Sequence, residues 1–389
     1  MSNVDQPFPV VAEPLARIPR TAYLLTACVA AIGSNSLVLG PIAPEVANGF
    51  GTSVALVMAA SSAFGLGTAA SALFLARYID RFGARRMLQR ALALLALALG
   101  ASALAPAIPV LIAAQLFAGV AAGIALPAIY SSAAAIAPRG RESGTIGVVL
   151  TGWTLSMVAG VSLSAVLADL VHWRAVFGVV AILAAAAAAS LSTISLADRP
   201  SGTAAPAPLQ ALSTPGIVPL LIACGAFMTA FYGVYGYLGD HLHQGLGRPV
   251  SANGLAAVSY GIGFGAAALL DGIVDRLGAR RVMPFAYLAV AAVYVLLAAI
   301  AGSFAALVAA MALWGLANHF GLNVLVMRLS ALDPARRGTI MGLNSAVTYL
   351  AVFVGTTAFG PLYASFGFTV SALAAAGLML VAAAAACWR

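Results

Sequence analysis

Twelve long apolar stretches divide this chain of 389 residues, and they constrain its fold more than any other feature. Each is close to or above the roughly 20 residues that cross the hydrocarbon core of a bilayer as an α-helix. A membrane β-barrel would instead show short segments that alternate between apolar and polar residues. The sequence therefore predicts spanning helices near 21–46, 53–77, 87–105, 108–136, 144–169, 173–196, 215–242, 251–271, 282–301, 303–329, 339–362 and 366–388.

Composition agrees with lipid as the solvent for most of the chain. Hydrophobic residues make up 62% of the sequence and charged residues only 8%, whereas soluble domains are usually about 25% charged. The first apolar stretch is as long as the later ones, so we interpret it as a spanning helix and not as a cleaved signal peptide. The three cysteines are scattered and predict no metal cluster.

Arginine alone supplies the net charge of +8, because the chain contains no lysine. If the N-terminus lies in the cytoplasm, every arginine except Arg174 and Arg248 falls on the cytoplasmic side of the predicted spans. This distribution follows the positive-inside rule, so it predicts that both termini are cytoplasmic and agrees with an even number of spans. It also explains the positive charge without a nucleic-acid partner.

One polar, proline-rich interruption divides the chain near its middle. We predict a cytoplasmic tail over 1–20, a six-helix bundle over 21–196, a flexible cytoplasmic linker over 197–214 and a second six-helix bundle over 215–389. The predicted fold is an all-α membrane protein with twelve transmembrane helices, arranged as two pseudo-symmetric six-helix bundles.

The two predicted bundles repeat each other in sequence. DRFGARR begins at Asp80 and DRLGARR begins at Asp275, an offset of 275 − 80 = 195 residues. A glycine recurs in the fourth and tenth stretches at Gly119 and Gly315, an offset of 315 − 119 = 196 residues. Parallel six-helix repeats occur in transporters that bind their substrate between the two halves, near the middle of the membrane.

The repeated loop resembles the signature G-x-x-x-D-R-x-G-R-[RK] of the major facilitator superfamily, and the resemblance covers essentially the whole chain. The first glycine of the signature is Ala76 in one copy and Asp271 in the other. In that family these loops lock the outward-facing state. The resemblance therefore implies a conformational gate formed by Asp80, Arg81, Gly83, Arg85, Arg86, Asp275, Arg276, Gly278, Arg280 and Arg281.

Elementary chemistry gives these loops two interpretations. Gly83 and Gly278 permit a tight reversal, and Asp80 can cap a helix N-terminus and pair with arginines. Alternatively, the loop is a basic turn that only anchors the topology, which explains one copy better than two.

The fifth apolar stretch resembles the drug and sugar exporters of the superfamily. It runs from Gly160 to a Trp-Arg pair at Trp173 and Arg174, in the spacing of the exporter motif. Two glycines of that motif are replaced by Ser164 and Ala165, and its proline is missing. The resemblance favours the drug and metabolite efflux branch.

Polar residues inside a bilayer are costly, so their distribution among the helices carries information. The third, sixth, ninth and twelfth stretches are nearly pure Ala, Leu and Val and predict lipid-facing helices. The first, fourth, seventh and tenth line the cavity in the family, and they hold the candidate substrate-binding residues Asn35, Gln115, Tyr130, Phe227, Phe231, Tyr232, Tyr235, Trp314, Asn318, His319 and Asn323. Any one of them could instead hydrogen-bond a neighbouring helix, but the whole set favours a cavity for a neutral or weakly cationic, partly apolar ligand.

Proton coupling has two candidate residues. Related proton-coupled exporters often place a carboxylate in the first helix and an arginine in the fourth, where this chain has Asn35 and Gln115. His319 is the titratable side chain predicted near the middle of the membrane, and Asp240 lies near an outer helix end. A neutral His319 that makes a structural hydrogen bond is the alternative.

We therefore expect a monomeric secondary transporter of a bacterial inner membrane that exports small, largely neutral molecules, with protons as the expected coupling ion. An importer or facilitator of a sugar, nucleoside or amino acid is the alternative, because the fold does not determine direction. A membrane enzyme or sensor is not expected, since there is neither a Walker loop nor an intramembrane nucleophile. No cofactor is predicted, and His241 and His243 are too weak a pair to predict a metal.

Overall fold

A computed structural model describes residues 18–138, 142–193, 207–270, 272–333 and 336–388. Most of the predicted tail and linker falls outside these ranges. The first half contains α1 (Arg20–Phe50), α2 (Val54–Phe74), η1 (Ala76–Tyr78), α3 (Ile79–Phe82), α4 (Ala84–Ala103), α5 (Ile108–Ile136), α6 (Glu142–Leu155), the π-helical η2 (Ser156–Val161), α7 (Ser162–Leu170) and α8 (Trp173–Thr193).

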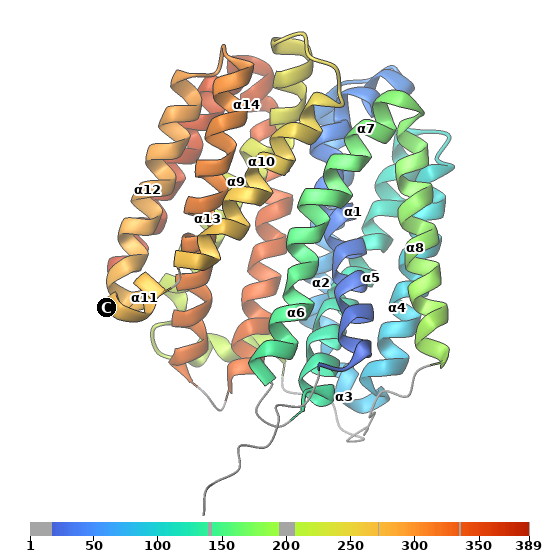
Figure 1. The fold of residues 1–389 in the computed structure, drawn as a ribbon, viewed down its shortest axis with the longest axis vertical. Coiled ribbons are helices and arrows are strands. Elements are labelled where there is room, and N and C mark those ends of the chain that lie inside the picture. The colour runs from blue at the N-terminus through green and yellow to red at the C-terminus, as the bar shows by residue number, and fades with distance from the viewer. Residues whose placement is uncertain (1–17, 139–141, 194–206, 271, 334–335, 389) are drawn as a thin grey trace, which may run out of the picture.

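The second half repeats this order. It contains η3 (Pro208–Ser213), α9 (Ile217–Asp240), the π-helical η4 (His241–Gly245), α10 (Ala252–Ala267), η5 (Ala268–Leu270), α11 (Gly272–Leu277), α12 (Ala279–Ala299), α13 (Phe304–Leu332) and α14 (Arg337–Cys387). Figure 1 shows the two halves side by side, with α3 and α11 near the lower ends of their bundles.

The predicted number of spans is reached once α14 is divided. Among the described residues, eleven helices are long and apolar enough to cross a bilayer. The last of them, α14, has 51 residues, which at about 1.5 Å per residue is more than twice the roughly 30 Å of a hydrocarbon core. Its backbone breaks at Gly367, where φ is 77°. It therefore supplies two spans, and the predicted all-α fold of twelve transmembrane helices is confirmed.

The same close helix crossings hold each half together. A Cβ atom added at Gly119 of α5 would collide with the carbonyl oxygen of Phe64 in α2, and one added at Gly315 of α13 would collide with that of Tyr260 in α10. The partners are separated by 260 − 64 = 196 residues, the same offset as the glycines. Small residues let helix backbones approach closely in membranes, so the sequence repeat is a repeat of packing.

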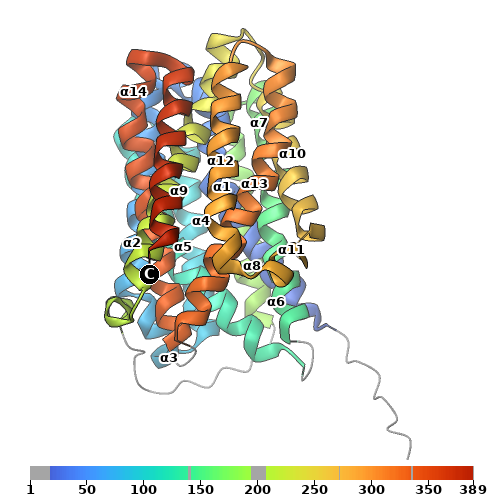
Figure 2. The same ribbon diagram turned by 90° about the vertical axis from the view of Figure 1, so that its left-hand side faces the viewer.

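The outer helices expose apolar side chains on the surface that would face lipid. Leu97 of α4 is 74% exposed, Ile182 of α8 is 70% exposed and Phe285 of α12 is 72% exposed. These helices correspond to the third, sixth and ninth predicted spans, and Figure 2 shows α12 on the outside of the second half. Exposed apolar residues on such helices are expected where hydrocarbon replaces water.

Two ends of the molecule are distinguished by their charge. The arginine-rich end carries the two repeated loops, at residues 76–86 and 271–281, and the arginine-poor end carries the turns near residues 51 and 247. Contacts between the halves run from the middle of the helices to the arginine-poor end: Phe64 lies against Tyr349, and Gly239 lies against Gly40. The two halves are therefore closed together at the arginine-poor end.

Candidate functional site

Two buried amides face each other inside the first half. The Asn35 Nδ2 atom donates to Gln115 Oε1 at 3.0 Å, and Gln115 Nε2 donates back to Asn35 Oδ1 at 3.3 Å. Gln115 Nε2 also donates to the Ser102 hydroxyl of α4 at 3.1 Å. This amide pair joins α1, α4 and α5 without any charged group, and Gln115 is 0% exposed.

Tyr130 has its partner on the next helix of the same half. Its hydroxyl accepts a hydrogen bond from the Trp153 indole nitrogen at 3.0 Å, which links α5 to α6. Both side chains are half-buried. Tyr130 therefore links two helices of the first half through its hydroxyl.

An aromatic cluster fills the interior of the second half. We define it as Phe231 and Tyr235 of α9, Tyr260 and Phe264 of α10, Tyr294 of α12 and Trp314 of α13. The ring of Phe231 is stacked on Tyr235 at 5.3 Å and lies 5.7 Å from Tyr260 and 5.4 Å from Trp314, between ring centroids. Such offset and edge contacts stabilise aromatic packing. Four of the predicted spans thus contribute rings to this cluster.

Only some of the polar atoms in and beside the aromatic cluster have hydrogen-bond partners among the described residues. The Asn318 Nδ2 atom donates to the Tyr260 hydroxyl at 2.9 Å. Asn318 Oδ1 and the Tyr235 hydroxyl are buried and have no hydrogen-bond partner among the described residues. Buried polar atoms are normally paired, so these atoms are places where a polar ligand group or a water molecule would be stabilised.

The remaining candidates in the second half lie at different depths. Phe227 is 2% exposed and packs against Tyr287 of α12 at 5.4 Å, inside the bundle. His319 is half-buried, and its ring meets Phe264 edge-on at 5.0 Å. Asn323 is half-buried one turn further along α13. The structure therefore brings His319 next to the aromatic cluster and directs Phe227 toward the peripheral helix.

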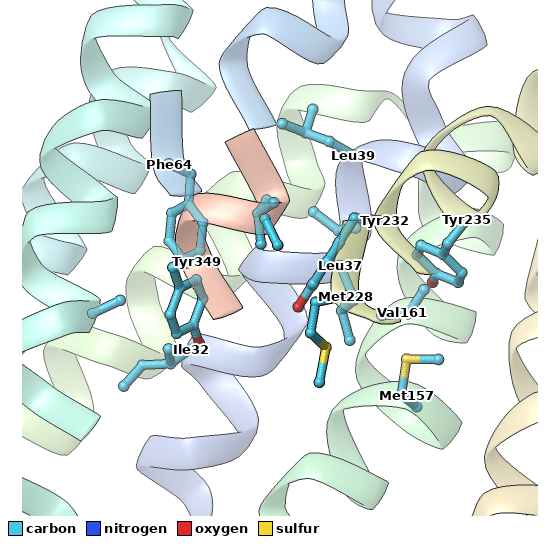
Figure 3. Packing of buried hydrophobic residues seen from close by; sticks show 14 of the residues in the cluster. Ile32, Leu37, Leu39, Phe64, Met157, Val161, Met228, Tyr232, Tyr235 and Tyr349 are labelled. Atoms are coloured by element: carbon cyan, nitrogen blue, oxygen red, sulfur yellow. The ribbon is translucent and has the colours of Figure 1, made fainter. Parts of the chain in front are cut away.

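The two halves meet through apolar side chains and also through polar contacts, among them a group of hydroxyls. The Ser62 hydroxyl of α2 lies 2.7 Å from the Thr356 hydroxyl and 3.0 Å from the Thr357 hydroxyl of α14. Figure 3 shows the rings of Phe64 and Tyr349 beside each other, and Tyr232 and Tyr235 of α9 in the same region as residues of α1 and η2. Tyr232 is 8% exposed at this interface.

The two repeated loops share their backbone geometry. Gly83 and Gly278 have φ angles of 89° and 84°, a conformation that favours glycine, and each precedes the next spanning helix. The tight reversals expected from the sequence are therefore present. The side chains of Asp80 and Asp275 lie outside the described part of the chain.

The arginines of the loops differ in their contacts. Arg85 donates from Nε to the Leu191 carbonyl at 3.1 Å and from Nη2 to the Ser192 carbonyl at 2.8 Å, at the end of α8. These carbonyls lack partners within their helix, so Arg85 fastens α4 to α8 within the first half. Arg81 lies over the Phe82 ring at 5.4 Å, and Arg86, Arg276, Arg280 and Arg281 are exposed.

Asp240 lies where α9 changes into the π-helical η4. Its Oδ2 atom accepts a hydrogen bond from the Tyr363 hydroxyl of α14 at 2.8 Å. The next residue, His241, uses Nε2 on the Ala301 carbonyl at 2.8 Å and stacks on Phe368 at 4.5 Å. All these partners belong to the second half. In the described part of the chain, no group of three or more His, Cys, Asp or Glu residues could hold a metal ion.

The motif of the fifth span is a packing feature in this structure. Residues Ser156–Val161 form a π-helical turn, and a Cβ atom at Gly160 would collide with the Ser34 hydroxyl of α1. Trp173 is 2% exposed, and the Arg174 guanidinium lies over its ring at 4.2 Å and donates to the Ala105 carbonyl at 2.8 Å. The Trp-Arg pair therefore holds α8 against the end of α4.

Several interior residues were not predicted from the sequence. Ser102 lies on α4, and Tyr287 and Tyr294 lie on α12, two helices that were expected to face only lipid. A signal was present for the tyrosines, because residues seven apart share one face of a helix. Tyr260 of α10 is likewise seven residues after Asn253.

The fold and the site together define a class of protein. It is a helical membrane protein of two repeated bundles whose interior carries aromatic and amide groups. The sequence profile of the Major Facilitator Superfamily matches residues 23–252 and 220–389. The chain therefore belongs to the major facilitator superfamily of transporters.

Similar proteins agree with this assignment. The uncharacterised MFS-type transporter YwfA of Bacillus subtilis (strain 168) is 26% identical over 372 residues, which cover 92% of this chain and 89% of YwfA. A chloramphenicol resistance protein of Streptomyces lividans is 28% identical over 279 residues, which cover 70% of each chain.

A solved structure shows the same fold. It is a bacterial homologue of the human lysosomal transporter Spinster in an inward-facing and occupied conformation. It matches this chain with a TM-score of 0.72 at 15% identity, over 94% of this chain and 95% of the homologue.

Proposed function

We propose that this protein exports small, largely neutral organic molecules across a bacterial inner membrane by alternating access. It works as a monomer whose bundles, residues 21–196 and 215–389, move against each other around the interior site. The arginine-rich end faces the cytoplasm, because arginine accumulates in cytoplasmic loops.

The uncharged chemistry of the interior carries this proposal. In the first half, the amide pair of Asn35 and Gln115 is a buried polar group. In the second half, aromatic rings surround the Asn318 amide and the Tyr235 hydroxyl. Without a fixed charge, such a site favours ligands that combine apolar surface with a few hydrogen-bonding groups. Similarity to a chloramphenicol resistance protein supports export of a drug-like molecule.

Proton coupling through Asp240 or His319 is the finer part of the proposal. Asp240 is bound by the Tyr363 hydroxyl, and His319 adjoins the aromatic cluster. A group that couples transport to protons must exchange its proton during the cycle. We expect Asp240→Asn or His319→Gln to uncouple movement of substrate from the proton gradient. If His319→Gln transports with unchanged pH dependence, His319 is removed as a candidate.

Reconstituted vesicles test the proposed function directly. Purified protein in proteoliposomes is given a panel of lipophilic dyes and neutral metabolites, with a proton gradient of either sign. Gradient-driven movement of a dye or drug against its concentration supports export. Equilibration of a sugar, nucleoside or amino acid, indifferent to the gradient, contradicts it and establishes the facilitator alternative.

A further inference from the structure

The two halves approach closely where α1 crosses α9, toward the arginine-poor end. A Cβ atom at Gly239 would lie 2.5 Å from the Gly40 carbonyl oxygen and 2.9 Å from Pro41 Cα. Pro44 has no N–H group, so the Gly40 carbonyl lacks its usual partner four residues ahead in α1. This crossing therefore brings backbone carbonyl groups of both halves together in a buried place.

One side chain satisfies carbonyls from both sides of this crossing. Asn253, in the first turn of α10, is 3% exposed. Its Nδ2 atom donates to the Pro41 carbonyl of α1 at 2.7 Å and to the Gly239 carbonyl of α9 at 3.4 Å. The orientation of the amide is determined by these neighbours, because the reversed amide would place its oxygen against two carbonyl oxygens.

Residues of this crossing also line a small cavity. Asn253 Oδ1 is buried without a partner among the described residues, as is the hydroxyl of Tyr235. Both residues line the cavity together with Pro41, Gly239, Leu242 and Met311. Packing around Asn253 is therefore incomplete, and its hydrogen bond to the Pro41 carbonyl is a polar contact that holds α10 against α1 here, while its second hydrogen bond stays within the second half.

We propose that Asn253 is the latch that keeps the arginine-poor end closed. This inference rests on the proposed alternating-access transport, but not on the identity of the substrate. When the halves separate at this end, Asn253 loses the Pro41 carbonyl and its amide becomes accessible to water. Opening is then opposed by a hydrogen bond that exists only in the closed state, and breaking the latch shifts the population toward the open one.

Thiol labelling in vesicles or cells tests the latch without any substrate. Met58 of α2 is 1% exposed, and its methyl group lies 2.9 Å from a Cβ position at Gly236 of α9. Met58→Cys, in a chain without its native cysteines, therefore reports separation of the halves through its reaction with a membrane-impermeant maleimide. Asn253→Asp keeps the shape of the side chain but replaces the donor with an acceptor.

We expect Asn253→Asp to raise the labelling rate of Met58→Cys by about 5- to 150-fold, the range of typical coupling energies. Asn253→Ala, which removes the donor without adding repulsion, raises it by less. Asn48→Asp is the matched control, since it adds the same charge to an exposed asparagine at the same end. A chain that retains only Cys28, 0% exposed inside the first half, reports general unfolding and is expected to stay unreactive.

The outcomes separate this inference from the proposed function. Equal labelling of Met58→Cys in the parent and in both Asn253 variants overturns the latch, whatever the protein transports. Increased labelling of Cys28 together with Met58→Cys in both Asn253 variants overturns it too, because the labelling then reports unfolding. If only the Asp variant unfolds, the labelling of Met58→Cys in Asn253→Ala decides. A specific increase at Met58→Cys establishes the latch even if no exported substrate is found.

Discussion

The amide pair of Asn35 and Gln115 makes a quantitative prediction, because each amide donates a hydrogen bond to the other. We consider Asn35→Leu and Gln115→Met, which keep the approximate size of each side chain and remove its polar atoms. Each single change leaves a buried amide without its partner. Because interhelical hydrogen bonds are lost, we expect the free energy of unfolding to fall in both variants.

The structure predicts the order of these two effects. Leaving a buried polar group unpaired costs about 1–3 kcal/mol. In Asn35→Leu, Gln115 keeps its 3.1 Å hydrogen bond to Ser102, so this variant lies at the lower end of the range. In Gln115→Met, Asn35 and Ser102 both lose their partner, although Ser102 still donates to the Ala98 carbonyl. Gln115→Met is therefore the more destabilising change.

The double variant measures the interaction itself. Interhelical hydrogen bonds in a membrane contribute about 0.6 kcal/mol on average, and the pair of Asn35 and Gln115 makes two of them. We therefore expect the double variant to be less destabilised than the sum of the single variants by about 1–2 kcal/mol. Reversible unfolding in mixed micelles with increasing denaturing detergent measures all four free energies.

Two other results would contradict a structural role of the Asn35 and Gln115 amides. If the three losses add without an interaction term, the two amides do not depend on each other in the folded protein. If the single variants unfold like the parent but fail to transport, the amides serve the substrate and not the bundle. The present geometry predicts a clear interaction energy between the two amides.

Three further predictions concern the contacts between and within the halves. The Ser62 and Thr356 hydroxyls are 2.7 Å apart, so cysteines at both positions of a cysteine-free chain should form a disulfide under mild oxidation and block transport until reduced, as measured by gel mobility and uptake. Gly239→Ala should overpack the crossing of α1 and α9 by about 1–3 kcal/mol and raise thiol labelling at the arginine-poor end. Arg85→Ala should lose the two bonds to α8 and lower the free energy of unfolding by about 1–2 kcal/mol, measured in the same micelles.

Matched controls are available in the chain for these predictions. A Cβ atom at Gly178 of α8 would meet nothing within 4 Å, so Gly178→Ala should leave thiol labelling unchanged, and equal responses at both glycines would contradict the overpacking argument. Arg86 is exposed beside Arg85, and Arg86→Ala should unfold like the parent. Either single cysteine at Ser62 or Thr356 should remain uncross-linked and transport in the absence of reductant.

Local patterns predicted the spans because lipid imposes the same rule on every helix. Each span must be apolar over a bilayer width and must satisfy its backbone internally. The predicted span 108–136 accordingly coincides with α5, and the repeat of Gly119 and Gly315 marks equivalent crossings in both halves. The π-helical turns of η2 and η4 left no comparable pattern.

The interior site was predicted as a set of residues but not as an arrangement. Asn35 and Gln115 are both polar residues of predicted cavity helices, yet only their positions in space show that they bond each other. Tyr294 was assigned to a lipid-facing helix, and its face is turned inward against Trp314 at 5.4 Å. Hydropathy describes how apolar a helix is, but it does not predict how that helix is rotated about its axis and therefore which face points inward.

The sequence by itself determined that this protein spans a membrane with twelve helices, that its halves are repeats, and that its interior carries amides and aromatic rings. Each of these follows from composition and spacing along one chain. Only the tertiary structure decided which end is closed and which residues close it. Asn253 meets the Pro41 carbonyl across 212 residues of sequence, and such a contact depends on the packing of two whole bundles, which no local pattern records.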